Sequence, residues 1–213
     1  MARYKNGING PVSGKVGSVV ASSWKGIDYV KGLSDPRGKQ GTPGQVGARQ
    51  IFATVSSWLR PLKLLINIGF QNCTEGMTPM NVAISLTLRE AVKGLGADRE
   101  IDFSRAVFSR GDLLISLIEG VTALVAGVLQ VMWRDAPASA FCKDTDRATF
   151  VFYNPAKEQF VAFEHVALRA DGEVVLQLPA EFSGDLVHCY QFYVSEQGDA
   201  VSSSQYLGQV LVG

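Results

Sequence analysis

Glycines divide the first thirty residues into short runs of β-branched and aromatic residues. Between Lys5 and Lys31, glycine recurs at positions 7, 10, 14, 17 and 26. Glycine adopts positive φ angles and allows close backbone approach, so in this context it predicts tight turns between strands. The valine, isoleucine, tryptophan and tyrosine residues between the glycines suit a pleated sheet. We expect two or three short strands, over about residues 15–22 and 26–31.

Two threonine–proline steps further along the chain mark the starts of predicted helices. In each step, threonine is a favourable N-cap and proline fits the first helical position. The predicted helices span about residues 43–59 and 79–93, and a strand is predicted over residues 101–108. Together with the glycine-divided strands, these elements predict that residues 1–112 form a small α+β assembly module.

From residue 113 the pattern changes to short β-prone runs at regular spacing, separated by turn-forming residues. Such spacing is typical of an all-β sandwich. The Asp171-Gly172 step between two apolar runs is also a strong hairpin signal. The predicted strands cover residues 123–133, 148–153, 160–167, 173–178, 186–195 and 205–212.

Three stretches of this part carry a more specific pattern. They are Val131-Met-Trp133-Arg-Asp-Ala-Pro, Thr149-Phe-Val-Phe-Tyr-Asn-Pro155 and Val187-His-Cys-Tyr190-Gln-Phe-Tyr-Val. They resemble the second, third and sixth strands of a fibronectin type III domain, so residues 113–213 resemble a fibronectin type III or immunoglobulin-like sandwich. The resemblance implies a spacer, interaction module or decoration. The residues expected in the sandwich core are Trp133, Phe150, Phe152 and Tyr190.

Other marks extend along the whole chain. They are Gly10-Pro-Val-Ser-Gly14-Lys-Val-Gly17, the Trp24-Lys-Gly26 step, the helix start at Thr42-Pro43, and Ser202-Ser-Ser-Gln-Tyr-x-Gly208. With these marks the chain resembles an uncharacterised family of about 210 residues found mainly in Bacteroidota. This resemblance implies no function.

Charge is unevenly distributed, although the chain as a whole has a net charge of zero. Residues 1–63 contain ten basic and two acidic side chains, a net charge of +8, so the remaining residues carry −8. A basic N-terminal part suits an anionic partner. That partner is either nucleic acid or the acidic part of a neighbouring copy. Alternatively, the two parts neutralise each other within one molecule.

The sequence contains none of the usual arrangements for catalysis or metal binding. Gly14-Lys15 lacks the Ser or Thr that follows the lysine of a nucleotide-binding loop. The three cysteines form no C-x-x-C pair, and aspartates at 144, 146 and 185 are interpreted as loop caps. We therefore expect no enzyme activity, no cofactor, no metal and no small-molecule substrate.

No apolar stretch marks a signal peptide, and none approaches the ~20 residues of a membrane span. We expect synthesis in the cytoplasm without a signal peptide, and export, if any, as part of a particle.

These observations predict a non-enzymatic structural protein that self-assembles or docks into a larger particle and displays a β-sandwich. A phage-tail-like or virion-like subunit and a filament are the architectures that we expect, with the protein itself or other structural subunits as partner. The alternative is a nucleic-acid-binding protein that uses the basic N-terminal arm. The residues expected in the assembly interface are Lys15, Val16, Val19, Trp24, Lys25, Tyr29, Lys31 and Arg37.

Overall fold

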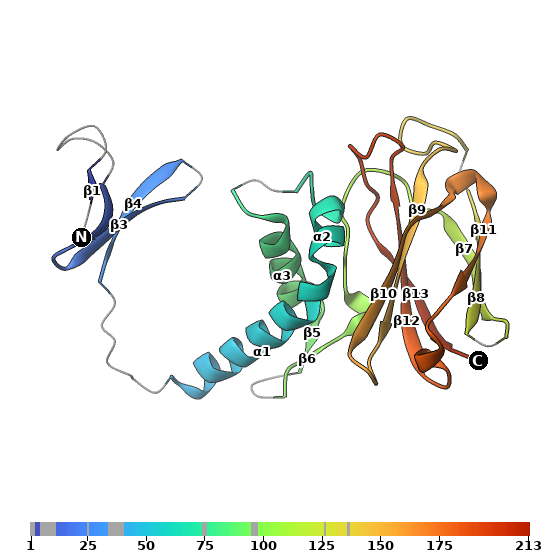
Figure 1. Ribbon diagram of the computed structural model, residues 1–213, viewed down its shortest axis with the longest axis horizontal. Coiled ribbons are helices and arrows are strands. Elements are labelled where there is room, and N and C mark those ends of the chain that lie inside the picture. The colour runs from blue at the N-terminus through green and yellow to red at the C-terminus, as the bar shows by residue number, and fades with distance from the viewer. Residues whose placement is uncertain are drawn as a thin grey trace. The chain divides into compact units, whose positions relative to one another are not determined.

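The computed structural model describes residues 3–4, 12–24, 26–33, 41–73, 76–94, 98–125, 127–135 and 137–213. Helices and antiparallel sheets are both present, so the predicted α+β class is confirmed (Figure 1). The chain divides into two compact units, unit 1 over residues 1–41 and unit 2 over residues 42–213.

Unit 1 is an antiparallel sheet in which each strand pairs with the next along the chain. Its strands are β1 (Arg3–Tyr4), β2 (Val12–Val16), β3 (Val19–Trp24) and β4 (Ile27–Gly32). Turns join β2 to β3 and β3 to β4, and Gly17 and Gly26 in these turns have φ angles of 56° and 81°, which glycine adopts without strain. The single strand predicted over residues 15–22 is therefore wrong, because a hairpin turn interrupts it at Gly17.

Unit 2 begins with three helices, and both predicted helix starts are confirmed. Thr42 forms a capping box, in which its hydroxyl accepts from the Gln45 N–H (3.4 Å) and the Gln45 side chain accepts from the Thr42 N–H (3.1 Å). Thr78 caps the third helix by accepting from the Asn81 N–H (3.3 Å). The helices are α1 (Pro43–Leu59), α2 (Lys63–Gly69) and α3 (Pro79–Glu90).

The strand predicted over residues 101–108 is largely wrong. Only β6 (Glu100–Ile101) is extended there, and it pairs with β5 (Val92–Lys93) just after α3. A 3₁₀ turn follows at Phe103–Arg105, because the Asp102 carboxylate accepts from the Ser104 N–H (3.1 Å) and so competes with strand pairing.

The remaining strands form two antiparallel sheets that face each other. The smaller has the order β11-β8-β7 and the larger the order β10-β9-β12-β13. Trp133, Phe150 and Phe152 are buried in the core between them. The strands are β7 (Leu117–Ala123), β8 (Val128–Arg134), β9 (Arg147–Asn154), β10 (Gln159–Leu168), β11 (Glu173–Gln177), β12 (Leu186–Val194) and β13 (Gln205–Leu211).

Two predictions for these strands are wrong. The run at residues 123–133 is the end of β7, a turn and most of β8, rather than one strand. The hairpin at Asp171-Gly172 does not form, because β10 pairs with β9 whereas β11 pairs with β8. A 3₁₀ turn at Arg169–Asp171, followed by Gly172 with φ 70°, carries the chain from one sheet to the other.

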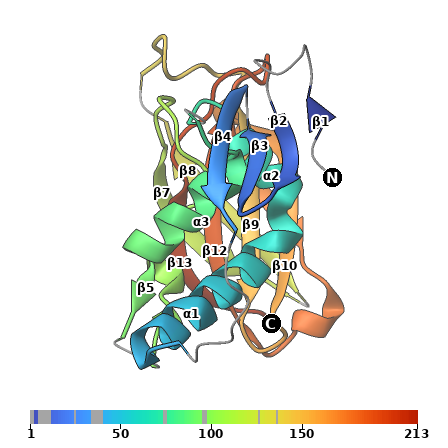
Figure 2. The ribbon, with the colours of Figure 1, turned by 90° about the vertical axis from the view of Figure 1, so that its left-hand side faces the viewer.

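The helices cover the outer face of the larger sheet, so unit 2 has three layers (Figures 1 and 2). Tyr190, expected in the sandwich core, is fully buried but lies on this helical side. Side chains alternate along a strand, so its neighbour Cys189 faces the smaller sheet and Tyr190 faces the helices. The Tyr190 hydroxyl donates to the Phe103 carbonyl (2.6 Å).

The boundary expected between residues 112 and 113 falls inside unit 2. Residues of α1, such as Val55 and Leu59, share one hydrophobic core with Val151 of β9 and Phe192 of β12. The structure instead divides the chain between residues 41 and 42.

A buried arginine joins three segments at the edge of the two facing sheets. Arg169, fully buried after β10, donates to the Asp146 carboxylate (3.2 Å), the Ser116 hydroxyl (3.2 Å) and the Leu114 carbonyl (2.7 Å). Its guanidinium lies 3.7 Å from the centre of the Tyr193 ring. The crossover between the sheets is thereby bonded to the segments that precede β7 and β9.

A fragment of residues 42–213 should unfold cooperatively, whereas a fragment of residues 113–213 should not. Without the helices, the second fragment exposes apolar residues of β9 and β12 that the intact unit buries. Circular dichroism during heating measures the cooperativity of unfolding of each fragment, and binding of a hydrophobic dye measures its exposed apolar surface. A sharp transition without dye binding in residues 113–213 would show that the helical layer is dispensable.

Arg169→Met should lower the free energy of unfolding by about 3–5 kcal/mol, because it leaves the Asp146 carboxylate buried without its partner. Arg134, which pairs with Glu119 at the surface, provides the control, and Arg134→Met should cost under ~1 kcal/mol. Urea unfolding compares the two variants. Equal losses would mean that the buried pair contributes no more than the exposed one.

Candidate functional site

The strand register of unit 1 divides the predicted interface residues between the two faces of its sheet. Val16 lies opposite Val19, and Ala21 opposite Val30, so these four side chains share one face. We call this the valine face, and Val12 of β2 also belongs to it.

The other face carries the basic and aromatic residues. Lys15 and Lys31 both lie opposite Val20, and Tyr29 lies opposite Ser22. Trp24 lies opposite Ile27 two residues further along the same strands. We call this the basic face, defined by Lys15, Val20, Trp24, Ile27, Tyr29 and Lys31.

Both faces are largely open. Ala21 is the one buried hydrophobic residue among the described residues of unit 1, at 6% exposure. By contrast, Val30 is 65% exposed on the valine face, and Trp24 and Ile27 are 53% and 69% exposed on the basic face. Apolar side chains on a sheet are normally covered by a second layer, and the described part of unit 1 supplies none.

Strand β4 also has an open edge. It pairs with β3 on one side, and no other described strand pairs with it. All its residues are exposed, including Asp28, Tyr29 and Lys31. An open strand edge of this kind presents free main-chain groups to which another chain can pair.

Two predicted interface residues, Lys25 and Arg37, lie outside the described residues.

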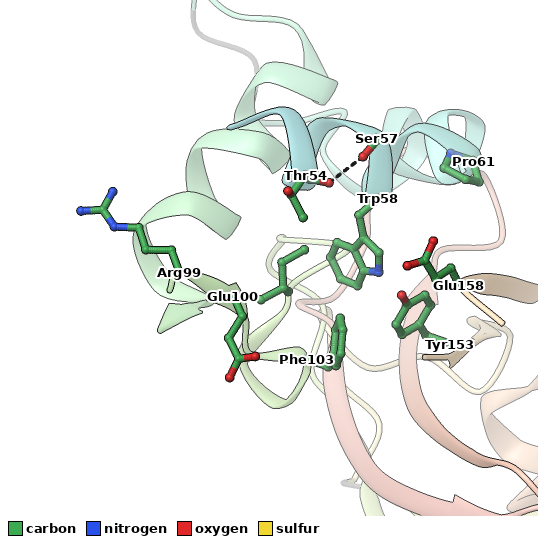
Figure 3. Close-up of a pocket in the computed structure, with 10 residues that line it drawn as sticks. Thr54, Ser57, Trp58, Pro61, Arg99, Glu100, Phe103, Tyr153 and Glu158 are labelled. Atoms are coloured by element: carbon green, nitrogen blue, oxygen red, sulfur yellow. Dashed lines mark hydrogen bonds between the residues drawn. The ribbon is translucent and has the colours of Figure 1, made fainter. Parts of the chain in front are cut away.

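Unit 2 contains a cavity of about 380 Å³ where α1 meets the larger sheet (Figure 3). Its walls come from α1, from the segment that begins β6, from β9 and from the turn between β9 and β10. The residues that line it are Thr54, Ser57, Trp58, Pro61, Arg99, Glu100, Ile101, Phe103, Tyr153 and Glu158.

Three aromatic rings form the inner wall of this cavity. The Trp58 ring centre lies 5.6 Å from that of Phe103 and 5.4 Å, edge to face, from that of Tyr153. Trp58 is 9% exposed, yet its indole N–H has no hydrogen-bond partner. In Figure 3 the indole nitrogen faces Glu158 and the Tyr153 hydroxyl. This N–H is itself buried, so the oxygens of Glu158 and Tyr153 are the acceptors toward which it is directed.

Two carboxylates border the cavity, and they differ in their partners. Glu100 pairs with Lys93 (3.1 Å), whereas Glu158 forms no ion pair with any described residue. Burial raises the pKa of Tyr153, the Trp58 indole N–H directed at its hydroxyl lowers it, and the charge of Glu158 raises it. The Tyr153 hydroxyl therefore stays protonated at neutral pH and can act as a donor.

Sequence reasoning missed this cavity, because its residues come from separate segments that meet only in the fold. No local signal in the sequence marks it, because the left-handed φ angle of 52° at Glu158 is a property of the folded turn.

Next to the cavity, His188 has both ring nitrogens in hydrogen bonds. Gln209 donates to its Nε2 (3.0 Å), so its Nδ1–H donates to the Tyr206 hydroxyl oxygen (2.9 Å). The ring centre lies 4.9 Å from that of Phe103, which lines the cavity. Burial lowers the pKa of His188, and Asp102 opposes this shift. A neutral imidazole with both nitrogens occupied has a structural role.

Among the described residues there is no cluster of three or more potential metal ligands. None of the described helices is both long and apolar enough to cross a membrane.

The model of a family of unknown function, DUF6266, matches residues 11–208. No curated protein and no solved structure matched the chain.

The free energy of unfolding should fall as the pH drops below about 6.5, and His188 should contribute to the fall. The unfolded chain takes up a proton on this residue near pH 6.5, whereas the folded chain, with its lowered pKa, takes it up only at lower pH. Above that range His188 is neutral in both states and contributes no pH dependence. Urea unfolding between pH 5 and 8 should show a smaller decline in His188→Gln. The control His165→Gln, at an exposed position, should keep the decline of the wild type.

Proposed function

The chain belongs to this family of unknown function over residues 11–208. We propose that the protein has a non-enzymatic structural role, in which unit 1 mediates self-assembly and unit 2 is displayed. The observation that carries the proposal is the uncovered sheet of unit 1. A sheet stabilises itself by burying an apolar face, and Ala21 alone is buried among the described residues of this sheet. Cover from a second copy would bury the valine face.

The open edge of β4 supports the same role. Strand addition at an edge takes its affinity from main-chain hydrogen bonds and its specificity from alternating side chains. On β4 these are Tyr29 and Lys31 on one face and Asp28 and Val30 on the other. A neighbouring copy that pairs here would extend the sheet and cover part of it at once.

The charges of the two units are complementary. Unit 1 contains seven basic and two acidic residues, a net charge of +5, so unit 2 carries −5. Contacts between unit 1 of one copy and unit 2 of the next would be head to tail. Such contacts close into rings or continue into filaments, and this is the basis on which we propose a filament or a phage-tail-like or virion-like particle.

The displayed part of unit 2 is, in this proposal, a fibronectin type III-like sandwich. Counted from β7, the second, third and sixth strands are β8, β9 and β12, which contain the three segments that resemble those strands. Trp133 on β8 lies in the core between the sheets. The helical layer over β9 and β12 is an addition to such a domain, and it is absent from the resemblance.

The composition of the basic face favours a second candidate function, nucleic-acid binding. Lys15 and Lys31 lie on the same face as Trp24 and Tyr29. Positive charges that contact phosphates, beside aromatic rings on which bases stack, are typical of proteins that bind single strands.

Substitutions on the two faces should separate these functions. Val30→Glu places a charge on the valine face at an exposed position, so it should weaken self-association at least tenfold without unfolding the chain. The combined change Lys15→Glu and Lys31→Glu should weaken association more at low salt than at high salt. Sedimentation velocity over a concentration series measures both effects.

Leu64→Glu is the matched control, because Leu64 is an exposed apolar residue on α2, and it should leave association unchanged. A chain that stays monomeric at high concentration contradicts the assembly role. If the lysine changes abolish a gel shift with single-stranded DNA but leave the sedimentation pattern unaltered, nucleic-acid binding is the better account.

A further inference from the structure

The cavity beside Trp58 combines the groups that recognise a cation. Trp58, Phe103 and Tyr153 present aromatic rings in mutual contact, and the Phe103 and Tyr153 ring centres are 4.8 Å apart. Aromatic faces attract ammonium and guanidinium groups through the negative potential of the ring. The carboxylate of Glu158 borders the same space without an ion pair among the described residues (Figure 3).

Glu158 is held there in an unfavourable backbone conformation. Its φ of 52° is strained for any residue with a side chain, and glycine would adopt it freely. Its carboxylate is retained at a turn position where glycine would be less strained, which supports a role for the side chain in the cavity. A carboxylate opposite aromatic rings supplies the counter-charge that a bound cation needs.

The cavity limits the shape of the ligand as well as its charge. A lysine side chain carries its ammonium group at the end of a flexible four-carbon stem, so it can enter a cavity while its own backbone stays in an exposed strand. The volume of about 380 Å³ suits one long side chain and its adjoining peptide group.

We propose that this cavity binds Lys31 from the open edge strand β4 of a second copy of the chain. Lys31 is exposed on β4, whose outer edge pairs with no described strand. The net charges of +5 on unit 1 and −5 on unit 2 favour this encounter. The inference rests on the proposed self-assembly and names the site on unit 2 that receives the basic face.

A double-mutant cycle on the full-length chain tests the contact. Glu158→Gln and Lys31→Gln should each weaken self-association about tenfold, and the double variant should also lose about tenfold, because both changes remove the same contact. Losses that multiply to about a hundredfold would show that Lys31 does not meet Glu158, and would overturn the proposal. If the degree of association does not rise with protein concentration, Lys31 of a second copy is not the ligand of the cavity.

Glu158→Gly separates binding from folding. It relieves the left-handed strain, so the variant should be no less stable than the wild type and yet associate about tenfold more weakly. Glu164→Gln, at an exposed position of β10, is the matched control and should associate as the wild type does. If Glu158→Gly also associates as the wild type does, the cavity takes no part in assembly.

A small probe tests the cavity independently of assembly. N-acetyl-lysine methylamide should shift the indole N–H signal that Trp58→Phe removes from the NMR spectrum, whereas N-acetyl-norleucine methylamide should not. If the chain proves monomeric but the lysine probe shifts this signal, the proposed assembly fails while the cation site stands. If the chain assembles and the probe has no effect, the cation site fails while the proposed assembly stands.

Discussion

Burial of β9 and β12 on both faces is the constraint on which the rest of unit 2 depends. Most sandwich strands alternate between a core and solvent, whereas here the helices replace solvent on one side of the larger sheet. The helices and the two sheets are therefore one cooperative structure. The same constraint creates the cavity, since Trp58 of α1 and Tyr153 of β9 meet only because a helix is packed onto this sheet.

Unit 1 has the opposite property. Its strands are paired as regularly as those of unit 2, but Val30 and Trp24 on its two faces are exposed. The larger sheet of unit 2 is thus covered on both faces, whereas the described residues of unit 1 cover neither face of its sheet. The contrast places the large hydrophobic cores in unit 2, and it is the reason for which we propose unit 1 as the part that contacts other molecules.

Local signals in the sequence predicted local structure well. The caps at Thr42 and Thr78 were recognisable because capping depends on residues within one helical turn. The pairing of strands was less predictable, since the turn chemistry of Asp171-Gly172 does not decide which sheet receives the next strand. The structure divides the chain between residues 41 and 42 rather than after residue 112, because apolar residues on the outer face of β9 pack against helices that come much earlier in the chain. No sequence pattern pointed to the cavity, because its walls are assembled from distant segments.

Buried and exposed charges of this protein should respond differently to ionic strength, and Arg169 is the buried example. Its guanidinium and the Asp146 carboxylate are both inaccessible to solvent, so dissolved ions screen their attraction little. The lysines of the basic face are exposed, and their interactions weaken as salt is added. In the proposed assembly, salt would therefore act as a reversible control on contacts between molecules, at concentrations that leave each folded subunit intact.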